Sequence, residues 1–328
     1  MARQSSGTSV ALICGSVAYD TILNFPDRFK AHILPEKLHI LNVSFLVPQM
    51  RREFGGCAAN IAYGLRLLGD RGLPMAVVGH DFAPYRERLQ ALNIAVDYIR
   101  ELPDSFTAQA YITTDLDDNQ ITAFHPGAMQ QAHLNRVAAA AADCGADIAV
   151  GIIAPDGRQA MIEHAAEFAA ANIPFIFDPG QGLPMFGADE LKTFIGQARW
   201  VAVNDYEWGM LQLKTGWTAA DLIEKVDALI VTRAAAGSLI HTKGRTFEIP
   251  CAAARAIVDP TGCGDAYRAG LIHGLLHDLD WQTTGRVASL MGAIKIESRG
   301  PQNHHFTRHE FERRFFDNFA QPAPGTHT

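Results

Sequence analysis

The order of apolar segments along the chain is the feature that most narrows its fold. Short runs rich in β-branched and aromatic residues alternate with longer runs rich in Ala and Leu. The short runs are typical of buried strands and the longer ones of helices. This alternation predicts an α/β fold with a central, mostly parallel sheet and helices on both faces. The expected strands are 10–14, 75–78, 148–152, 175–177, 200–203 and 229–232, and the expected helices are 57–68, 85–92, 136–144, 159–171, 205–214, 221–226, 266–277, 283–298 and 307–319.

Two segments, 21–48 and 106–124, interrupt this alternation with strand-like patterns between turns that contain Pro, Asp and Asn. Residues 115–119 have a turn composition and separate the runs 107–113 and 120–124, which predicts a hairpin. We expect the two segments to pair as a small β lid, the alternative being ordinary surface hairpins. The large domain then comprises 10–20, 49–105 and 125–319, and the tail 320–328, rich in Pro, Gly and Thr, is predicted to be disordered.

Composition excludes some classes of partner. The 328 residues are enough to bury a large core, and the formal net charge of −7 comes without any basic run. We therefore expect neither a nucleic-acid partner nor a membrane-surface helix. The apolar run 10–14 is too short for a signal or a membrane span. Five scattered cysteines indicate a reduced, cytoplasmic protein. The thirteen histidines show no metal-site pattern, and His304 with His305 is expected to be an exposed loop pair.

Residues 259–265, Asp-Pro-Thr-Gly-Cys-Gly-Asp, form a glycine-punctuated turn that opens directly into an apolar run. Gly262 and Gly264 allow the backbone to approach an anion closely. A helix starting there presents unpaired N–H groups and its positive dipole end to that anion. A carboxylate at this position, Asp265, is unfavourable beside an anion unless it does chemical work, such as accepting a proton. The alternative is a simple turn in which Asp265 is an N-cap.

A second glycine motif lies early in the chain. Gly55 and Gly56 precede an amphipathic run, and Asn60 falls one turn into it. The early Gly-Gly-x-x-x-Asn and the late Asp-x-x-Gly-x-Gly-Asp together resemble the two signatures of the ribokinase-like (pfkB) carbohydrate kinase family. Asn204 and Glu207 are similar to the family's Asn-x-x-Glu element. The resemblance implies a ribokinase-like fold with a small β-sheet lid.

Polar residues follow several of the expected strands. Because ligands bind outside the carboxyl ends of parallel strands, these residues are expected to converge on one edge of the sheet. A single residue of this kind is often only a cap or a turn former, but five at one edge are harder to explain in that way. They are Asp20, Asp178, Asn204, Thr232 with Arg233, and Asp259.

The resemblance implies a role for each motif residue. Asp265 would be the general base that takes the proton from a primary hydroxyl as its oxygen attacks the γ-phosphoryl group of ATP. The N–H groups of Gly262, Cys263 and Gly264 would stabilise the charge that develops. Ala234 departs from the family, which usually has Gly there, and this weakens the case for a close backbone contact. The implied ATP-binding residues are Asn204, Thr232, Arg233, Gly237, Gly262 and Gly264, with Mg²⁺ held through water by Asn204 and Glu207, and a possible K⁺ near Asp259 and Thr261.

The segments 25–29, 33–36, 43–47, 124–129 and 204–208 look like those of bacterial adenosine kinases and broader nucleoside kinases. This similarity runs from about Ala11 to about Gln302. Some relatives have a stacking aromatic residue where this chain has Ala110, so a broader range of bases is expected. The implied substrate-binding residues are Ser16, Ser44, Phe124, Gln181 and Asn204 in the nucleoside pocket, Phe124 stacking on the base, Asp20 and Asn60 on the ribose diol, and Gly55 and Gly56 close to the ligand.

These observations predict an ATP- and Mg²⁺-dependent nucleoside 5′-kinase, with adenosine as the first substrate. The alternatives are a ribose or related sugar kinase of the same fold, and a broad nucleoside kinase acting on inosine, guanosine or cytidine. A nucleotide-sensing or scaffold protein that lost activity is disfavoured, because Asp265, Asn204 and Glu207 occur together. The expected partners are the nucleoside and ATP, and the chain is expected to be a monomer or a homodimer clasped through 21–48.

Overall fold

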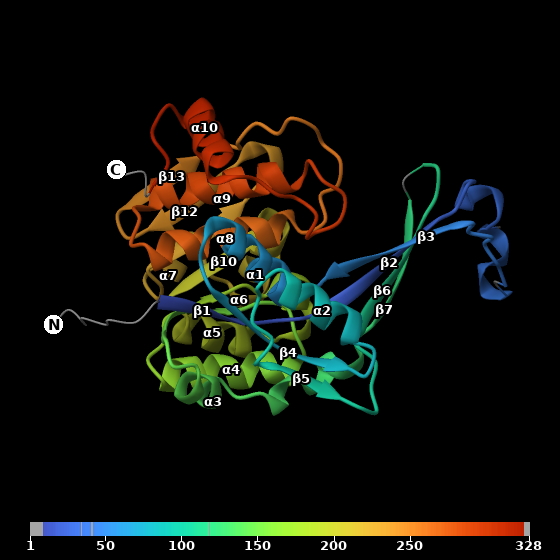
Figure 1. The fold of residues 1–328 in the computed structure, drawn as a ribbon, viewed down its shortest axis with the longest axis horizontal. Helices are drawn as coiled ribbons and strands as arrows, with labels where there is room; N and C mark the ends of the chain where they lie inside the picture. Colours follow the sequence, from blue (N-terminus) through green and yellow to red (C-terminus); the bar gives the residue numbers. More distant parts are fainter. Residues whose placement is uncertain (1–8, 34, 41, 118, 325–328) are drawn as a thin grey trace.

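A computed structural model describes residues 9–33, 35–40, 42–117 and 119–324 (Figure 1). Its larger sheet has nine strands in the order β13-β12-β11-β10-β9-β8-β1-β4-β5. The strands from β11 to β5 are parallel, and β12 and β13 add an antiparallel edge. The bounds are β1 (Ser9–Cys14), β4 (Gly72–Gly79), β5 (Ile99–Leu102), β8 (Asp147–Ile153), β9 (Phe175–Phe177), β10 (Trp200–Asn204), β11 (Ala228–Thr232), β12 (Ser238–Thr242) and β13 (Arg245–Ile249).

Helices cover both faces of this sheet, which confirms the predicted α/β layering. In β1, Ala11 and Ile13 belong to one core, and Val10 and Leu12 belong to the core on the opposite face. A strand buried on both faces needs a continuous apolar run, which is the pattern seen in the sequence. The first face carries α1 (Cys57–Leu68), α2 (Ala83–Ala91), α8 (Cys263–Leu276) and α9 (Trp281–Lys295); the second carries α3 (Val137–Asp143), α4 (Arg158–Ala170), α5 (Ala188–Gln197), α6 (Asp205–Thr215) and α7 (Ala219–Ile223). The last helix, α10 (Arg308–Phe319), packs against α9.

The helices α1 and α8 pack side by side and run in the same direction. Asn60 near the start of α1 contacts Asp265 near the start of α8, and Asp70 after α1 contacts His273 near the end of α8. Between these contacts the helices approach closely, since a Cβ at Gly64 would lie only 2.6 Å from the Cβ of Ala269. This pair positions the site described below.

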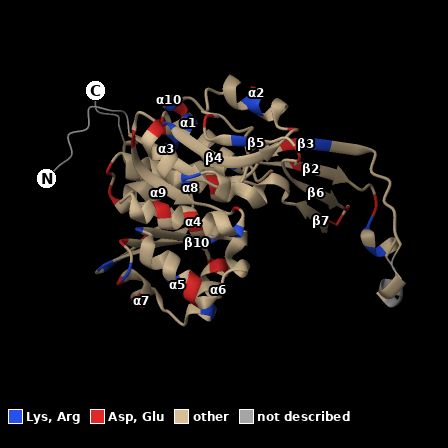
Figure 2. Cartoon of the chain, turned by 90° about the horizontal axis from the view of Figure 1, so that it is seen from below, with Lys and Arg blue, Asp and Glu red and all other residues tan. Residues whose placement is uncertain are grey.

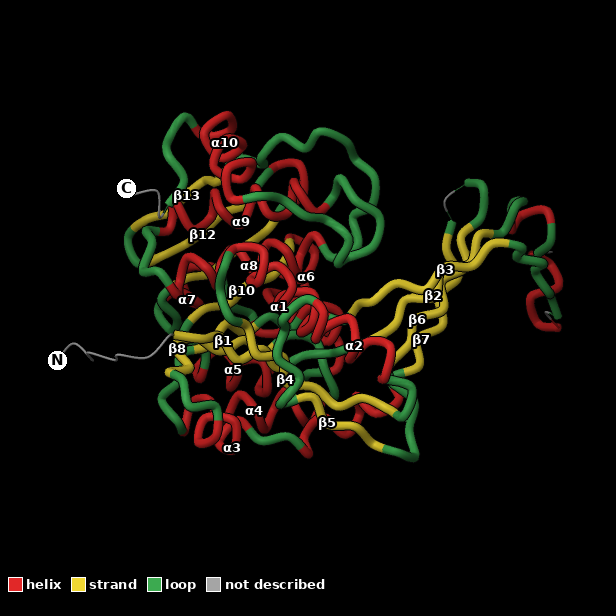
Figure 3. The backbone as a smooth tube through the Cα atoms, in the orientation of Figure 1, coloured by secondary structure: helices red, strands yellow, loops and turns green. Residues whose placement is uncertain are grey.

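A separate four-stranded sheet projects from the larger body (Figures 2 and 3). Its strand order is β3-β2-β6-β7, with β2 (Ala18–Asn24), β3 (Gln49–Gly55), β6 (Ala108–Thr114) and β7 (Gln120–His125). The strands β6 and β7 pair antiparallel, which confirms the predicted hairpin. Residue 118 of its turn lies outside the described residues.

The composition of the small sheet differs from the predicted ranges. Residues 49–55, assigned from sequence to the large domain, form a strand of the small sheet, and β2 begins at residue 18. Between β2 and β3 the described residues form no strand, only the short 3-10 helices η1 (Phe29–Ala31) and η2 (Pro35–Ile40). The aromatic rings of Phe25, Phe29 and Phe45 pack on one another there, so their spacing reflects a local cluster and not a strand face.

Predictions for the tail, for His304 and for the bounds of one helix were also wrong. The tail was expected to be disordered from residue 320, but Ala323 is 5% exposed and packs in the core beneath α10; residues 325–328 lie outside the described part. His304, expected on an exposed loop, is 2% exposed and packs edge-on against Tyr63. The helix predicted at 221–226 starts earlier, because Thr218 forms a capping box with Asp221.

The helix α5 was not predicted from the sequence. None of the described helices is both long and apolar enough to span a bilayer.

Candidate active site

The glycine turn leads directly into α8, as predicted. Gly262 is the N-cap and has φ +82, a conformation that favours glycine. The Cys263 N–H donates to the Pro260 carbonyl at 3.1 Å, so the predicted anion hole cannot use it as a free donor. Within the described residues, the N–H groups of Gly262, Gly264 and Asp265 have no protein acceptor. The free donors therefore include Asp265 in place of Cys263, and they lie at the positive end of the helix dipole.

The carboxylate of Asp265 is held at the head of α8 by Asn60. The Asn60 Nδ2 donates to Asp265 Oδ2 at 2.8 Å, which joins the early and late glycine motifs. Burial raises the pKa of Asp265 to about 6, and the charge of Asp178 adds to this effect while the bond from Asn60 opposes it. At neutral pH the group is thus mostly ionised and still basic enough to accept a proton.

A chain of buried hydrogen bonds fixes the amide of Asn60. The Gln302 Nε2 donates to Asn60 Oδ1 at 2.9 Å and to the Tyr85 hydroxyl at 2.5 Å, and that hydroxyl donates to the Gly55 carbonyl at 2.8 Å. Because the Asn60 oxygen is engaged by a donor, its NH₂ group must face Asp265. Sequence reasoning missed Gln302 and Tyr85, since Gln302 stands 242 residues from Asn60 and no local motif links them.

A buried ion pair lies one turn further along α8. The Arg268 guanidinium donates to both oxygens of Asp178 at 3.0 Å, and each residue is 5% exposed. Asp178 follows β9, where a polar edge residue was predicted, but Arg268 was missed. Its charge lowers the pKa of Asp265 and so offsets the effect of Asp178. The spacing Asp265-x-x-Arg268 on a helix was the available signal.

The small sheet contributes a second carboxylate, Asp20 on β2. A Cβ at Gly55 would lie 2.5 Å from Asp20 Oδ2, so only glycine leaves room for this carboxylate. Burial raises the pKa of Asp20 to about 6, with the charges of Glu53 and then Asp259 adding to it. The small sheet therefore contributes a buried carboxylate with a raised pKa beside Gly55, the residue just before the N-cap of α1.

The start of α1 is built on Gly56 and Ser16. Gly56 has φ +91, and a Cβ there would lie 2.6 Å from the Ser16 carbonyl oxygen. The Ser16 hydroxyl accepts from the Cys57 N–H at 3.1 Å. Both residues therefore hold the first turn of α1 against the end of β1, in addition to any contact with a ligand.

Strand register places Phe124 in one row with Asp20. Asp20 pairs with Ala110 on β6, and Ala110 pairs with Phe124 on β7. Residues paired in this way point to the same face of a sheet, and two strand spacings span about 10 Å. Phe124 is 52% exposed. The row thus presents a carboxylate, a small side chain and an aromatic ring in sequence on one face.

Ser44 and Gln181 are not joined to this group. Both are exposed, and in the described portion neither has a hydrogen bond to the residues around Asp265. Ser44 precedes Phe45, whose ring packs on that of Phe25, the residue after β2. The segment that joins β2 to β3 lies at the end of the small sheet that is remote from the larger body (Figure 3). Gln181 lies in the 3-10 helix η4 (Gly180–Met185).

Asn204 and Glu207 form a capping box at the start of α6. The Asn204 N–H and Nδ2 donate to the two Glu207 oxygens at 2.8 and 2.9 Å, and the Glu207 N–H donates back to Asn204 Oδ1 at 2.8 Å. Burial raises the pKa of Glu207. Each carboxylate oxygen keeps a lone pair for a water molecule, so the pair fits a magnesium ion held through water. Asn204 is also in register with Thr232, which ends β11.

The loop after Thr232 contains the predicted phosphate-binding residues. Arg233 donates to the Ala236 carbonyl at 3.2 Å. Gly237 has φ +79, and a Cβ there would lie 2.1 Å from a backbone oxygen of β13. Ala234 has φ +47, the left-handed conformation that costs a residue with a Cβ about 1 kcal/mol. This is a physical reason for the glycine that the family usually has at that position.

Asp259 and Thr261, the predicted K⁺ position, are tied to a buried lysine. The Asp259 carboxylate accepts from the N–H groups of Thr261 and Gly300 at 2.9 and 2.8 Å. Lys295, 0% exposed at the end of α9, donates from Nζ to the Asp259 carbonyl at 2.7 Å and to the Ser298 carbonyl at 3.1 Å. Burial lowers the pKa of Lys295, and Asp259 opposes that effect. An ammonium group therefore lies directly behind the turn.

The fold and this site together define a phosphotransferase: a helix N-terminus for an anion, a basic carboxylate beside it, and a second carboxylate on a separate sheet. The model of the pfkB family carbohydrate kinases matches residues 17–307. The chain belongs to this family.

Within this family, the chain is similar to several nucleoside kinases. The nucleoside kinase of Methanocaldococcus jannaschii is 33% identical over 270 residues, covering 81% of this chain and 87% of the relative. The solved structure of Burkholderia thailandensis nucleoside kinase in complex with inosine is 50% identical, with a TM-score of 0.86 over 96% of this chain and 100% of that one. The same enzyme in complex with ADP-inosine is 51% identical, with a TM-score of 0.84 over 97% and 98% of the two chains. These likenesses confirm the ribokinase-like fold with its small separate sheet.

Proposed function

We propose that this chain transfers the γ-phosphoryl group of ATP to the 5′-hydroxyl of a ribonucleoside, giving the nucleoside 5′-monophosphate and ADP. The observation that carries the proposal is the hydrogen bond from Asn60 Nδ2 to Asp265 Oδ2, which holds a carboxylate beside the free N–H groups at the N-terminus of α8. The nucleoside kinases named above support the choice of a nucleoside over a free sugar. Adenosine is the first substrate to test.

In the proposed reaction, each residue of the site has a separate role. Asp265 accepts the proton of the 5′-hydroxyl while that oxygen forms the bond to the γ-phosphorus, and the bond to the leaving ADP oxygen breaks. The free N–H groups of Gly262 and Gly264 stabilise charge on the transferring group. Asp20 binds the ribose diol, together with Asn60, and Phe124 stacks on the base at the other end of the same row.

Asn204 and Glu207 would hold Mg²⁺ through water near the nucleotide. When bound, the ion neutralises charge on the β- and γ-phosphate oxygens. Thr232, Arg233 and Gly237 would contact the nucleotide from the loop beside them.

A broad base range is the second candidate. Ala110 leaves the space between Asp20 and Phe124 without a second stacking ring. The Burkholderia relative was solved with inosine, so inosine is the base variant to test beside adenosine, with guanosine and cytidine. Ribose serves as the test of the sugar-kinase alternative.

The experiment is a product assay with the full chain, ATP and MgCl₂. Each nucleoside and ribose is supplied at equal concentration, and the monophosphate and ADP are separated by chromatography. Formation of AMP or IMP with an equal amount of ADP supports the proposal. Phosphorylation of ribose but of no nucleoside would show that the chain is a sugar kinase instead.

The residues around Asp259 and Thr261, where a K⁺ ion was predicted, do not fit that ion. The Lys295 ammonium already contacts the Asp259 carbonyl, and a second cation a few ångströms away would be repelled. Lys295 supplies this positive charge from within the chain. We expect equal activity in KCl, NaCl and choline chloride. Lys295→Ala, which empties the position, is expected to lower activity and to make it respond to KCl but not to choline chloride; KCl activation of the wild type would overturn this assignment.

A further inference from the structure

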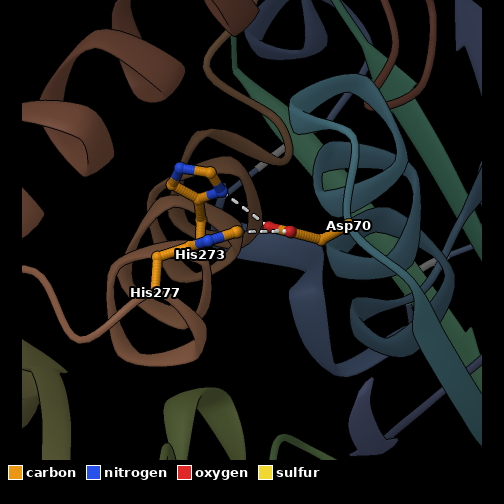
Figure 4. A group of neighbouring side chains, drawn as sticks. All are labelled: Asp70, His273 and His277. Carbon is orange, nitrogen blue, oxygen red and sulfur yellow. Dashed lines mark hydrogen bonds and ion pairs between the residues drawn. The ribbon is translucent and has the colours of Figure 1, made fainter. Parts of the chain in front are cut away.

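A second group of polar side chains lies at the opposite end of α8. His273 lies in the last turn of α8 and His277 is its C-cap, and both side chains point toward Asp70, which follows α1 (Figure 4). The His273 Nδ1 lies 2.6 Å from Asp70 Oδ2, and the His277 Nε2 lies 2.8 Å from Asp70 Oδ1. One ligand atom from each residue lies within 4.8 Å of the others. The proposed phosphoryl transfer uses none of these side chains.

The sequence alone shows the two histidines of this group but not its aspartate. His-x-x-x-His at residues 273–277, on the expected helix 266–277, places two imidazoles on one face, a spacing that the expectation of no metal-site pattern among the histidines did not weigh. Asp70 stands 203 residues from His273, and only the packing of α1 on α8 brings it to the pair.

The surroundings favour a cation. The carbonyl ends of α1 and α8 both meet this group, and helix C-termini carry negative partial charge. Two imidazole nitrogens and a carboxylate are ligands that zinc prefers. The side chains of Asp70 and His273 are 10% and 14% exposed, so they are already withdrawn from bulk water, while that of His277 is 51% exposed and leaves a route of entry.

The side chains lie close enough together to reach one ion after a local adjustment. Ligand atoms around a tetrahedral zinc ion lie about 3.3 Å apart, given metal–ligand distances of about 2.0–2.1 Å. The two nitrogen–oxygen separations here, 2.6 and 2.8 Å, are to different oxygens of Asp70, and both are shorter than the zinc value by about 0.5–0.7 Å. One ligand atom from each residue lies within 4.8 Å of the others, so the three side chains must rotate to reach a single ion. The close approach of α1 and α8 at Gly64 keeps the two backbones in place.

We propose that Asp70, His273 and His277 bind one divalent transition-metal ion, with Zn²⁺ as the probe, and that the ion joins the C-terminal ends of α1 and α8. Three protein ligands leave the remaining position to water. The ion is a structural link between the helices, and it is distinct from the Mg²⁺ proposed near Asn204.

The test uses the untagged full chain after treatment with EDTA and buffer exchange. Isothermal titration with ZnCl₂ is expected to give one site, and Co²⁺ is expected to produce visible absorption bands of a low-symmetry complex. Melting temperature is expected to rise with Zn²⁺. His277→Gln, which changes the most exposed ligand and spares the fold, should weaken Zn²⁺ binding by roughly tenfold or more.

His309→Gln is the matched control, because His309 is an exposed histidine on α10 outside the group. It should bind Zn²⁺ as the wild type does. Asp70→Asn should lose the Co²⁺ bands, and circular dichroism without metal checks that it is folded. Equal Zn²⁺ affinity of the wild type and His277→Gln, or no binding by the wild type, would overturn the proposal and leave a purely hydrogen-bonded contact.

Discussion

The two ends of the α1–α8 pair carry opposite chemistry. At the N-terminal ends, Asn60 holds Asp265 beside free N–H groups, and the helix dipoles favour an anion. At the C-terminal ends, Asp70 holds His273 and His277, and the same dipoles favour a cation. His273 is eight residues after Asp265, about 12 Å along the helix axis. In the two proposals above, the direction of this one helix pair sets which end would bind a phosphate and which end a metal ion.

If the comparison is right, the N-terminal ends of the two helices determine catalysis and the C-terminal ends determine stability. Changes at the N-terminal ends should alter turnover and its pH dependence. Changes at the C-terminal ends should alter stability and leave turnover nearly unchanged. The predictions below test that separation, beginning with the largest expected effect.

Asp265→Asn removes the proposed base while keeping the size of the side chain. We expect kcat to fall by about 10²–10⁴-fold, because general-base catalysis typically contributes that much. ATP binding, measured by titration calorimetry, should survive. The partner variant is His273→Gln at the other end of α8, which should keep kcat within about twofold, since it is remote from the reacting atoms. Equal kcat in Asp265→Asn and the wild type would remove the base assignment.

The pH dependence of activity should report the titration of the Asp265 carboxylate. Because the pKa of Asp265 is about 6 in the folded chain, protonation of this base alone should lower turnover about tenfold from pH 7 to pH 5. The folded state also binds this proton more tightly than the unfolded chain. Its stabilising contribution is therefore complete below about pH 4 and is lost as pH rises through about 6.

Asp20 has a similarly raised pKa of about 6, so the profile needs a control. Asp20→Asn should raise KM for the nucleoside while the acid limb of kcat persists. If that limb disappears in Asp20→Asn, the titration belongs to the sugar-binding carboxylate and not to the base.

Gln302→Leu tests the hydrogen bonds that orient Asn60. Without the Gln302 donor, the Asn60 amide is free to rotate, and kcat/KM should fall by about tenfold. The acid limb should also move to higher pH, because the bond from Asn60 lowers the pKa of Asp265. Tyr85→Phe removes only the hydroxyl at the far end of the chain of bonds and should have a smaller effect on both quantities. An unmoved acid limb in a folded Gln302→Leu protein contradicts this positioning role.

The parts of the molecule predictable from sequence were those determined locally. The helix at 57–68 and the strand at 175–177 matched their predicted bounds. Gly56 and Gly69 bound the amphipathic run of the helix, and Pro174 and Asp178 bound the short apolar run of the strand. The glycine motifs predicted Asn60 and Asp265 through their likeness to a family.

The contacts that support these residues depend on tertiary packing. Gln302 reaches Asn60, and Asp70 reaches His273, across more than 200 residues of chain. The aromatic cluster around Phe45 imitated a strand pattern, and the N–H of Cys263 was consumed by a turn whose geometry the motif alone does not specify.

The middle of the α1–α8 pair offers the most direct test of the comparison. Gly64→Ala adds a Cβ that would lie 2.6 Å from the Cβ of Ala269, so the helices must separate, at a cost of about 1–3 kcal/mol in unfolding free energy. Gly209→Ala is the matched control: it is a helical glycine on α6 with no atom near its Cβ position, and it should gain about 0.5–1 kcal/mol. Denaturant unfolding measures both. If the ends are coupled only through this packing, Gly64→Ala should weaken Zn²⁺ binding and lower kcat together, whereas a change in one without the other would mean that each end is held independently.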